Sequence, residues 1–250
     1  MPLNRAIFPL SFFLLFSEIA SSGVSANWIK KDSDHFTFHF LNEQKMTSED
    51  IAFQEKSLTK EMTYLGISPP KTKIQYFLHP DKKSLKDRID FDGNAVTILS
   101  GPPDDPKTLF ELHSIYPRDR HEIIHVLLFP KGLPLLIWTE GIAVYRAELW
   151  HGKNIKDAAR DAFLKTKLSL VDLIDEKSFR NDEMISYPIA GAFVEFLAET
   201  YGIKPFMKSY EELGRFGQKS KVSEVDKILT KIYSKKLNDL NSEFKAWLEK

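Results

Sequence analysis

The alternation of polar and apolar residues predicts a strand near the start of the chain. Residues 35–40 read His-Phe-Thr-Phe-His-Phe, so every second side chain is a phenylalanine. Because successive side chains of a strand point to opposite faces, this pattern predicts that Phe36, Phe38 and Phe40 face the core and that both histidines face outward.

The first half of the chain contains further strand and helix patterns. Apolar residues recur at helical spacing over about five turns and end at a glycine, and two later stretches are rich in β-branched and aromatic residues. A stretch of glycine and proline then predicts a turn that leads into the next helix. The elements predicted here are a helix at 47–65, strands at 73–78 and 95–99, and a turn-rich loop at 101–106.

Helical spacing dominates the second half. Pro117 suits the first turn of a helix that runs through residues 121–128 and ends near Pro130. A short link at 131–134 then leads into a helix at about 136–149. Further helices are predicted at about 154–165, 187–201, 203–213, 221–233 and 236–249.

These patterns predict an α+β fold. Strands are expected only in the front part of the chain, and the rest is expected to be helical. We therefore expect one domain at 27–250, built from a strand-rich lobe at about 27–116 and a helical lobe at about 117–250.

The first 26 residues have the pattern of a cleaved signal peptide. Arg5 supplies positive charge, residues 7–16 are apolar, and small residues at 24–26 precede the expected cleavage after Ala26. An uncleaved membrane anchor is the alternative, but the apolar run is shorter than the roughly 20 residues needed to span a bilayer. The sequence thus predicts a secreted or periplasmic protein with no stable membrane insertion after cleavage.

Composition excludes several classes of function. The chain has no cysteine, so disulfides, thiolate metal sites and cysteine nucleophiles play no part. Its 35 basic residues balance 35 acidic ones, and loss of Arg5 and Glu18 with the signal peptide preserves that balance. Because nucleic-acid binding usually needs a basic excess or stripe, we expect no nucleic-acid partner.

Residues 121–125 carry the strongest chemical signal in the chain. They read His-Glu-Ile-Ile-His, and residues four apart on a helix lie on one face, so His121 and His125 can bind one metal ion. Imidazole nitrogens suit zinc, and Glu122 beside them can take a proton from an attacking water. The alternative is an amphipathic helix with two hydrogen-bonded or surface histidines, but the surrounding apolar residues predict a buried helix.

A third zinc ligand is expected on the following helix. Glu140 begins an otherwise apolar helical stretch, and a tight link would bring it back to the histidine pair. Gly141 and Ala143 are small, which would allow this helix to approach the motif helix closely. The alternative role for Glu140 is stabilisation of the helix dipole at its N-terminus.

The two motifs together resemble a known family. His-Glu-Ile-Ile-His followed by Trp-Thr-Glu-Gly-Ile-Ala-Val-Tyr is similar to the gluzincin clan of zinc metallopeptidases, relatives of thermolysin and aminopeptidase N, and most to its peptidase-MA-like branch. The resemblance implies a zincin-like fold with the site between its two lobes. It also implies one Zn²⁺ per chain, held by His121, His125 and Glu140, with Glu122 as general base.

The resemblance implies less specific roles elsewhere. It makes Tyr187 a candidate donor to the tetrahedral intermediate, although a tyrosine here could simply pack. It also makes residues 93–98 a candidate edge strand that holds the substrate backbone, with an ordinary core strand as the alternative. Thermolysin-like members have an aspartate where this chain has Val144, so another acceptor must orient the histidines, and Asp119 and Glu148 are the nearest in sequence.

The expected function is therefore hydrolysis of peptide bonds in a peptide or protein substrate by an exported zinc metallopeptidase. One alternative is a catalytically silent module of the same fold that binds a peptide or a cell-wall component. A second alternative keeps the metal but cleaves another amide, for example in peptidoglycan. Retention of Glu122 favours an enzyme, because a pure binder has no need of a base.

Overall fold

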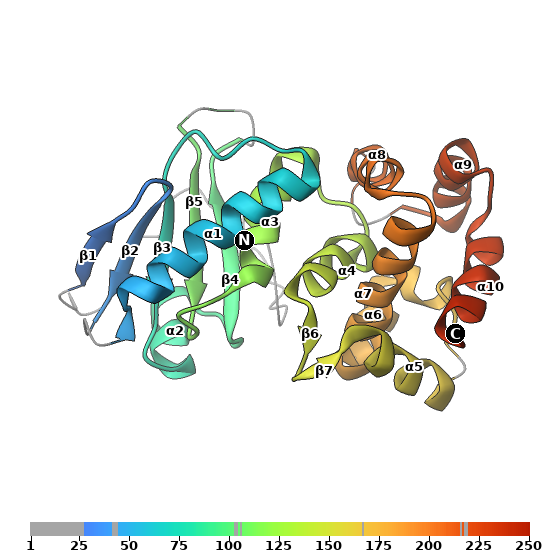
Figure 1. Cartoon of the computed structure of the whole chain (residues 1–250), viewed down its shortest axis with the longest axis horizontal. Helices are drawn as coiled ribbons and strands as arrows, with labels where there is room; N and C mark the ends of the chain where they lie inside the picture. The colour runs from blue at the N-terminus through green and yellow to red at the C-terminus, as the bar shows by residue number, and fades with distance from the viewer. Residues whose placement is uncertain are drawn as a thin grey trace, which may run out of the picture. The chain divides into compact units, whose positions relative to one another are not determined.

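The computed structural model describes residues 28–41, 45–102, 105, 107–166, 168–215, 217 and 220–250. The predicted signal peptide lies outside the described residues. The chain divides into two compact units, with the boundary between Leu127 and Leu128. The α+β class predicted from the sequence is confirmed: the N-terminal unit contains a mixed sheet, and the C-terminal unit is mostly helical (Figure 1).

Five strands form the sheet of the N-terminal unit, in the order β1-β2-β3-β5-β4. The outer pairs β1–β2 and β4–β5 are antiparallel, whereas β2–β3 and β3–β5 are parallel. β4 therefore lies at one edge of the sheet, as the resemblance implied for this segment. The strands are β1 (Ile29–Asp32), β2 (Phe36–Phe40), β3 (Ile74–Leu78), β4 (Ala95–Ser100) and β5 (Leu109–Ser114).

Both faces of this sheet carry buried side chains. Phe36, Phe38 and Phe40 are fully buried, as the alternation in β2 predicts. His39 points to the opposite face and is also buried, so the expectation that it faces solvent is wrong. The reason is that helix α2 (Lys82–Ile89) covers that face, where its Leu85 joins a hydrophobic cluster with residues of β4.

An aromatic ladder crosses the covered face. His39 of β2, Phe77 of β3 and His113 of β5 occupy one register across three neighbouring strands. The ring centroids are 4.3 Å apart for His39 and Phe77 and 4.6 Å apart for Phe77 and His113, with nearly parallel rings. Arg88 of α2 lies over the central ring, 4.5 Å from its centroid. Ring stacking across neighbouring strands thus stabilises this part of the covered face, where aliphatic side chains would ordinarily pack.

Local signals explain where helix α1 (Ser48–Leu65) begins and ends. Thr47 and Asp50 form a capping box, in which each side chain bonds the backbone of the other. Gly66 follows in the left-handed conformation that glycine adopts without strain. The predicted helix at 47–65 is confirmed. The predicted loop at 101–106 lies partly outside the described residues, and the element that follows β4 is the strand β5 and not a helix. The helix α2 had no counterpart in the prediction.

The predicted helices of the C-terminal unit are present with shifted ends. The largest shift is in α7, which begins at Glu183 and therefore includes Pro188. The elements are α4 (Leu136–Ala147), β6 (Leu149–Trp150), β7 (Lys153–Asn154), α5 (Ile155–Lys165), α6 (Glu176–Asn181), α7 (Glu183–Thr200), α8 (Ile203–Gly214), α9 (Val222–Tyr233) and α10 (Leu237–Leu248), with short 3-10 turns at Phe129–Lys131 and Asp172–Ile174.

Two glycines allow helices α4 and α7 to pack closely. A Cβ atom at Gly141 would lie 2.7 Å from the carbonyl oxygen of Ala190, and one at Gly191 would lie 2.5 Å from Val144 Cγ1. Either contact is far shorter than van der Waals distance. Gly141 thus serves the contact with α7, whereas the sequence had assigned it to the approach of the motif helix.

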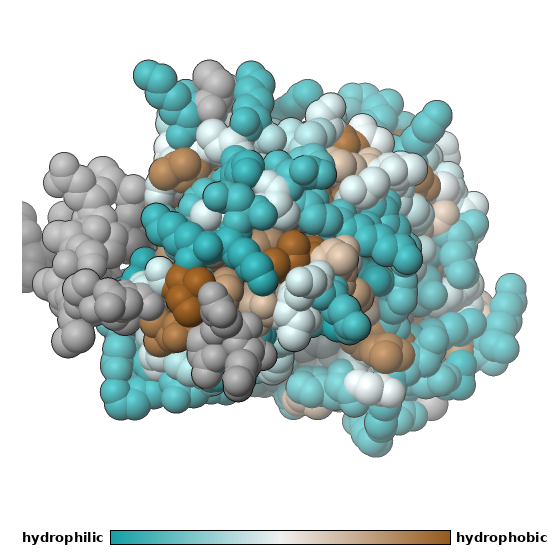
Figure 2. Space-filling model, turned by 60° about the vertical axis from the view of Figure 1, so that its left-hand side comes forward, coloured by the Kyte–Doolittle hydropathy of each residue, from teal (hydrophilic) through white to brown (hydrophobic). Residues whose placement is uncertain are grey.

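One face of the molecule is mostly polar. Figure 2 shows hydrophilic residues over most of one face, with small hydrophobic patches between them. Among the described residues, none of the helices has the length and apolar character needed to span a bilayer. Large exposed hydrophobic side chains come from separate segments, as is normal for a protein surface, and are Leu41, Leu109, Tyr116, Leu149, Met184 and Val222.

Candidate metal centre

The motif helix α3 (Arg120–Leu128) begins directly after a buried aspartate, Asp119. The backbone N–H of Glu122 donates a hydrogen bond of 3.2 Å to Asp119 Oδ1, and Ser114 Oγ donates one of 2.8 Å to Asp119 Oδ2. Asp119 therefore acts as the N-cap of α3. The prediction that Pro117 occupies the first turn is wrong, because the helix starts after the cap.

The capping role of Asp119 affects which groups can orient the ligand histidines. Asp119 had been one of two candidates, but its two oxygens accept hydrogen bonds from the start of α3 and from β5. Glu148, the other candidate, is exposed and forms the left-handed C-cap of α4, with φ 71°. Val144, where thermolysin-like members have an aspartate, packs against Gly191 of α7.

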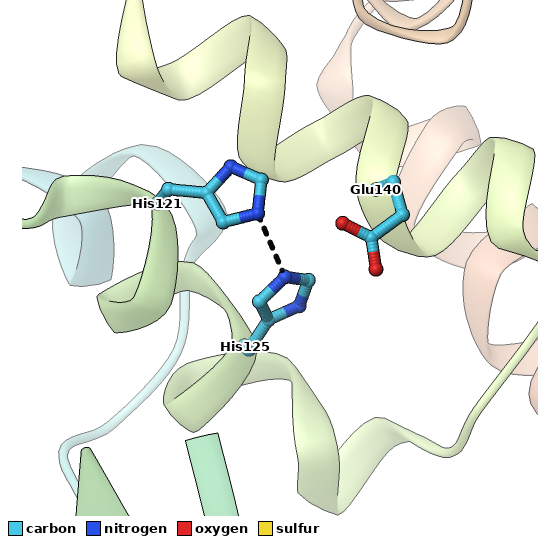
Figure 3. A group of neighbouring side chains, drawn as sticks. All are labelled: His121, His125 and Glu140. Atoms are coloured by element: carbon cyan, nitrogen blue, oxygen red, sulfur yellow. Dashed lines mark hydrogen bonds between the residues drawn. The ribbon is translucent and has the colours of Figure 1, made fainter. Parts of the chain in front are cut away.

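The two motif histidines face each other on α3. Their Nε2 atoms lie 3.1 Å apart, and the ring planes are inclined at 74° (Figure 3). His125 is 1% exposed, and His121 is half-buried. The helical spacing that predicted a shared face for these side chains therefore brings two imidazole nitrogens to one point.

Glu140 completes a group of three metal-ligand types. One ligand atom of each of His121, His125 and Glu140 lies within 4.8 Å of the others. Glu140 lies on α4 and is 1% exposed. Figure 3 shows its carboxylate turned toward the two imidazoles. Among the residues that the structure describes, this is the group of three or more such side chains with ligand geometry.

The donor set fits zinc. A tetrahedral ion with Zn–N distances of about 2.0–2.1 Å holds two nitrogens about 3.3 Å apart, close to the 3.1 Å between the two Nε2 atoms. Two histidines and one glutamate are also the ligand types of a catalytic zinc site, in which the fourth position takes water or substrate.

Glu122 is held by a residue that sequence reasoning did not single out. Thr97 Oγ1 donates a hydrogen bond of 2.8 Å to Glu122 Oε2 and lies 3.2 Å from the backbone oxygen of the same residue. Both side chains are 2% exposed. Thr97 belongs to β4, the edge strand, and no local pattern in the sequence points to it.

Tyr187 lies in the second turn of α7 and is 4% exposed. Its ring stacks on Trp150 with a centroid distance of 5.4 Å and contacts Phe179 at the same distance. The packing role that the sequence offered as an alternative is therefore present. The proposed role of Tyr187 in catalysis concerns its hydroxyl group, whereas the packing contacts are made by its ring.

A further acid, Glu183, lies one turn before Tyr187. Burial raises the pKa of its carboxyl group, and the negative charge of Glu140 adds to this effect, whereas Arg180 opposes it. No pattern in the sequence points to Glu183, because its interaction with Glu140 depends on the packing of α7 and α4.

Comparison with known proteins adds no relative to this picture: no protein-family model matches the chain, and no curated protein matches its sequence. The functional assignment therefore rests on the residues and their geometry.

Proposed function

We propose that this chain is a zinc-dependent metallopeptidase of the gluzincin type. The observation that carries the proposal is the convergence of His121, His125 and Glu140, whose ligand atoms lie within 4.8 Å of one another. Two of these residues come from the His-Glu-Ile-Ile-His motif, and the third comes from the Trp-Thr-Glu-Gly stretch that accompanies it in the peptidase-MA-like branch.

Different residues of the chain have different proposed roles in peptide hydrolysis. Zinc held by the three ligands would supply a Lewis acid that polarises the reacting water and the substrate carbonyl. Glu122 accepts the proton of the attacking water and later passes it to the amine that leaves. Tyr187 is proposed to donate a hydrogen bond from its hydroxyl to the oxygen of the tetrahedral intermediate.

The proposed substrate is a peptide or protein in an extended conformation. β4 lies at the edge of the sheet, so one side of its backbone can pair with an added strand. The charge balance of the chain gives no preference for nucleic acid. We propose a secreted or periplasmic location from the signal-peptide pattern of residues 1–26 alone.

Metal analysis of the purified chain tests the centre itself. We expect one zinc per chain in the wild type and a large loss of zinc in His121→Ala. His151→Ala is the matched control, because this exposed histidine lies outside the group, and it should retain full zinc. A wild-type zinc content far below one per chain would overturn the proposal.

Turnover of a fluorogenic peptide library tests the chemistry. Glu122→Gln should keep its zinc and lose peptide hydrolysis by roughly 10²–10⁴-fold, the usual contribution of a general base. A chain that binds peptides equally tightly with and without this substitution, and cleaves none of them, would instead be the silent binding module. Equal turnover by the wild type and Glu122→Gln would exclude the proposed mechanism.

A further inference from the structure

We propose that Thr97 is a positioning residue for Glu122, and that it ties the general base to the strand on which the substrate would lie. The inference rests on the proposed function, because it assigns Glu122 its role as base. It adds a residue that neither of the two sequence motifs contains, and which lies on a different element of the fold.

The contact between these two residues is short and enclosed. Thr97 Oγ1 lies 2.8 Å from Glu122 Oε2, and each side chain is 2% exposed. An ionised carboxylate can only accept hydrogen bonds, so the hydroxyl proton of Thr97 must be the donor. The backbone oxygen of Glu122 is farther away, at 3.2 Å, and charge-assisted bonds are the stronger ones. The single proton of Thr97 is therefore assigned to the carboxylate.

The surrounding sheet fixes the position of this donor. β4 pairs with β5 along its whole length, and Thr97 lies opposite Leu112 in that register. The neighbours Val96 and Ile98 point to the other face of the sheet, where they pack against Leu85 of α2. Thr97 thus has little freedom to move, and its hydroxyl can restrict the rotamers of the longer glutamate side chain.

This geometry links binding and proton transfer. If an extended substrate pairs with the backbone of β4, its position is set by that strand. The Thr97 hydroxyl then sets the position of the base relative to the same strand. Because proton transfer needs donor and acceptor at hydrogen-bond distance, the contact would raise the rate of the chemical step and leave substrate affinity unchanged.

A purely structural role is the competing explanation. A buried hydroxyl needs a partner in any protein, and the carboxylate could be that partner without any effect on the reaction. The two explanations differ in what a substitution does to kcat at unchanged fold and metal content.

The test compares Thr97→Val, which removes the hydroxyl and keeps the shape, with Thr97→Ser, which keeps the hydroxyl. We expect Thr97→Val to lower kcat about tenfold or more, as loss of a charge-assisted hydrogen bond can do, with KM changed less than twofold. Zinc content and the thermal unfolding midpoint should stay close to wild type. Thr97→Ser should restore most of kcat. If the valine variant loses zinc or cooperative unfolding, Thr97→Cys takes its place, since a thiol is only a weak donor.

Combination with Glu122→Gln separates the possible outcomes. In that background the valine substitution should cause no further loss of residual turnover, because the base it positions is absent. Wild-type kcat in Thr97→Val, failed rescue by Thr97→Ser, or an equal loss in the Glu122→Gln background would each overturn the inference. Full turnover by Glu122→Gln alone would overturn the proposed function itself, so the two failures are distinguishable.

Discussion

Asp119 shows how one side chain can place the metal-binding residues. As the N-cap of α3, it bonds the backbone N–H of Glu122 and so closes the first helical turn. His121 lies within that turn, where helices fray unless they are capped. The negative charge of Asp119 also interacts favourably with the positive N-terminal end of the helix dipole. The aspartate therefore supports zinc binding without itself being a ligand.

Removal of this cap should weaken both the fold and the metal centre. We expect Asp119→Ala to cost about 1 kcal/mol of unfolding free energy, the usual value for a lost N-cap, and to lower zinc affinity through a looser first turn. Chemical denaturation and zinc competition titration measure the two effects. Asp119→Asn is the matched control, since its side-chain oxygen can still cap the helix. Unchanged zinc affinity in Asp119→Ala would contradict the argument.

At this scale, sequence predicts only what is local. His121, Glu122 and His125 could be identified because helical spacing alone places them together. Thr97 is 25 residues from Glu122 and lies on another element, so its contact depends on the tertiary fold. The small size of Gly141 indicates a close helix contact, but the sequence does not reveal that the contacting helix is α7. Spacing along one helix does not tell which other helix faces it.

Contacts between whole elements decide how α4 is held in the C-terminal unit. The closest approach of α4 and α7 depends on glycines on both helices, one opposite a backbone oxygen and one opposite a valine side chain. Glycine normally lowers helix stability relative to alanine. Its presence within these two helices indicates that close packing outweighs that cost. The position of Glu140 depends on this packing, because it lies next to Gly141.

Gly191→Ala should therefore destabilise the C-terminal unit, although the same change stabilises an unconstrained helix by about 1 kcal/mol. The added methyl group would lie 2.5 Å from Val144 Cγ1, and such overpacking typically costs 1–3 kcal/mol. Urea denaturation measures the change. Val144→Ala in the same chain should recover part of the loss, because it removes the clashing methyl group. Additive effects of the two substitutions would show that the clash is relieved by another route.

Elements with strong local signals were predictable, and others were not. α1 has a capping box, helical spacing and a terminal glycine, all visible in the sequence. α2 buries only Leu85, so its hydrophobic pattern is weak. β5 was missed because its buried residues include His113, a polar type, which breaks the alternation expected of a strand with one wet face.

Across the whole molecule, ionisable groups that are buried in the N-terminal unit and half-buried in the C-terminal unit respond in opposite directions to a fall in pH. In the N-terminal unit His79 Nε2 lies 3.0 Å from His113 Nδ1, and His113 Nε2 lies 3.2 Å from Glu111 Oε2. Burial, with a smaller effect of His113, lowers the pKa of His79 to about 3, and burial also lowers the pKa of His113. In the C-terminal unit, burial and the nearby Glu199 raise the pKa of Glu195.

Mild acid should thus weaken the N-terminal unit first. The lowered histidine pKa values contribute stability that is fully present above pH 6.5 and is lost as the pH falls from 6.5 toward 3, by up to about 1.4 kcal/mol per pH unit for each proton. The raised pKa of Glu195 has the opposite sign, since its contribution becomes more favourable as the pH falls. The interval from pH 6.5 to 4.5 is the most informative, because ordinary carboxylates remain more than half ionised throughout it.

Hydrogen exchange of peptides from β3 and β5 measures this effect, after correction for the intrinsic pH dependence of exchange. Protection should decline between pH 6.5 and 4.5 more steeply than in α7. His79→Asn should flatten the decline, and the exposed His151→Asn should leave it unchanged. An equally steep decline in His79→Asn would rule out the buried histidine pair as its cause.

The hydrogen bonds of the histidine pair all run in one direction, from His79 through His113 to Glu111. The Glu111 carboxylate, whose pKa is lowered chiefly by its hydrogen bond with His113, can only accept, so His113 carries its proton on Nε2. Its bare Nδ1 then accepts from the Nε2–H of His79. Each ring is thus held in one tautomer, because moving the proton to the other nitrogen of either ring would place two donors or two acceptors face to face. An added proton must therefore enter at His79 Nδ1, which lies 3.4 Å from the hydroxyl of Ser84, at the end of the chain of bonds opposite the carboxylate.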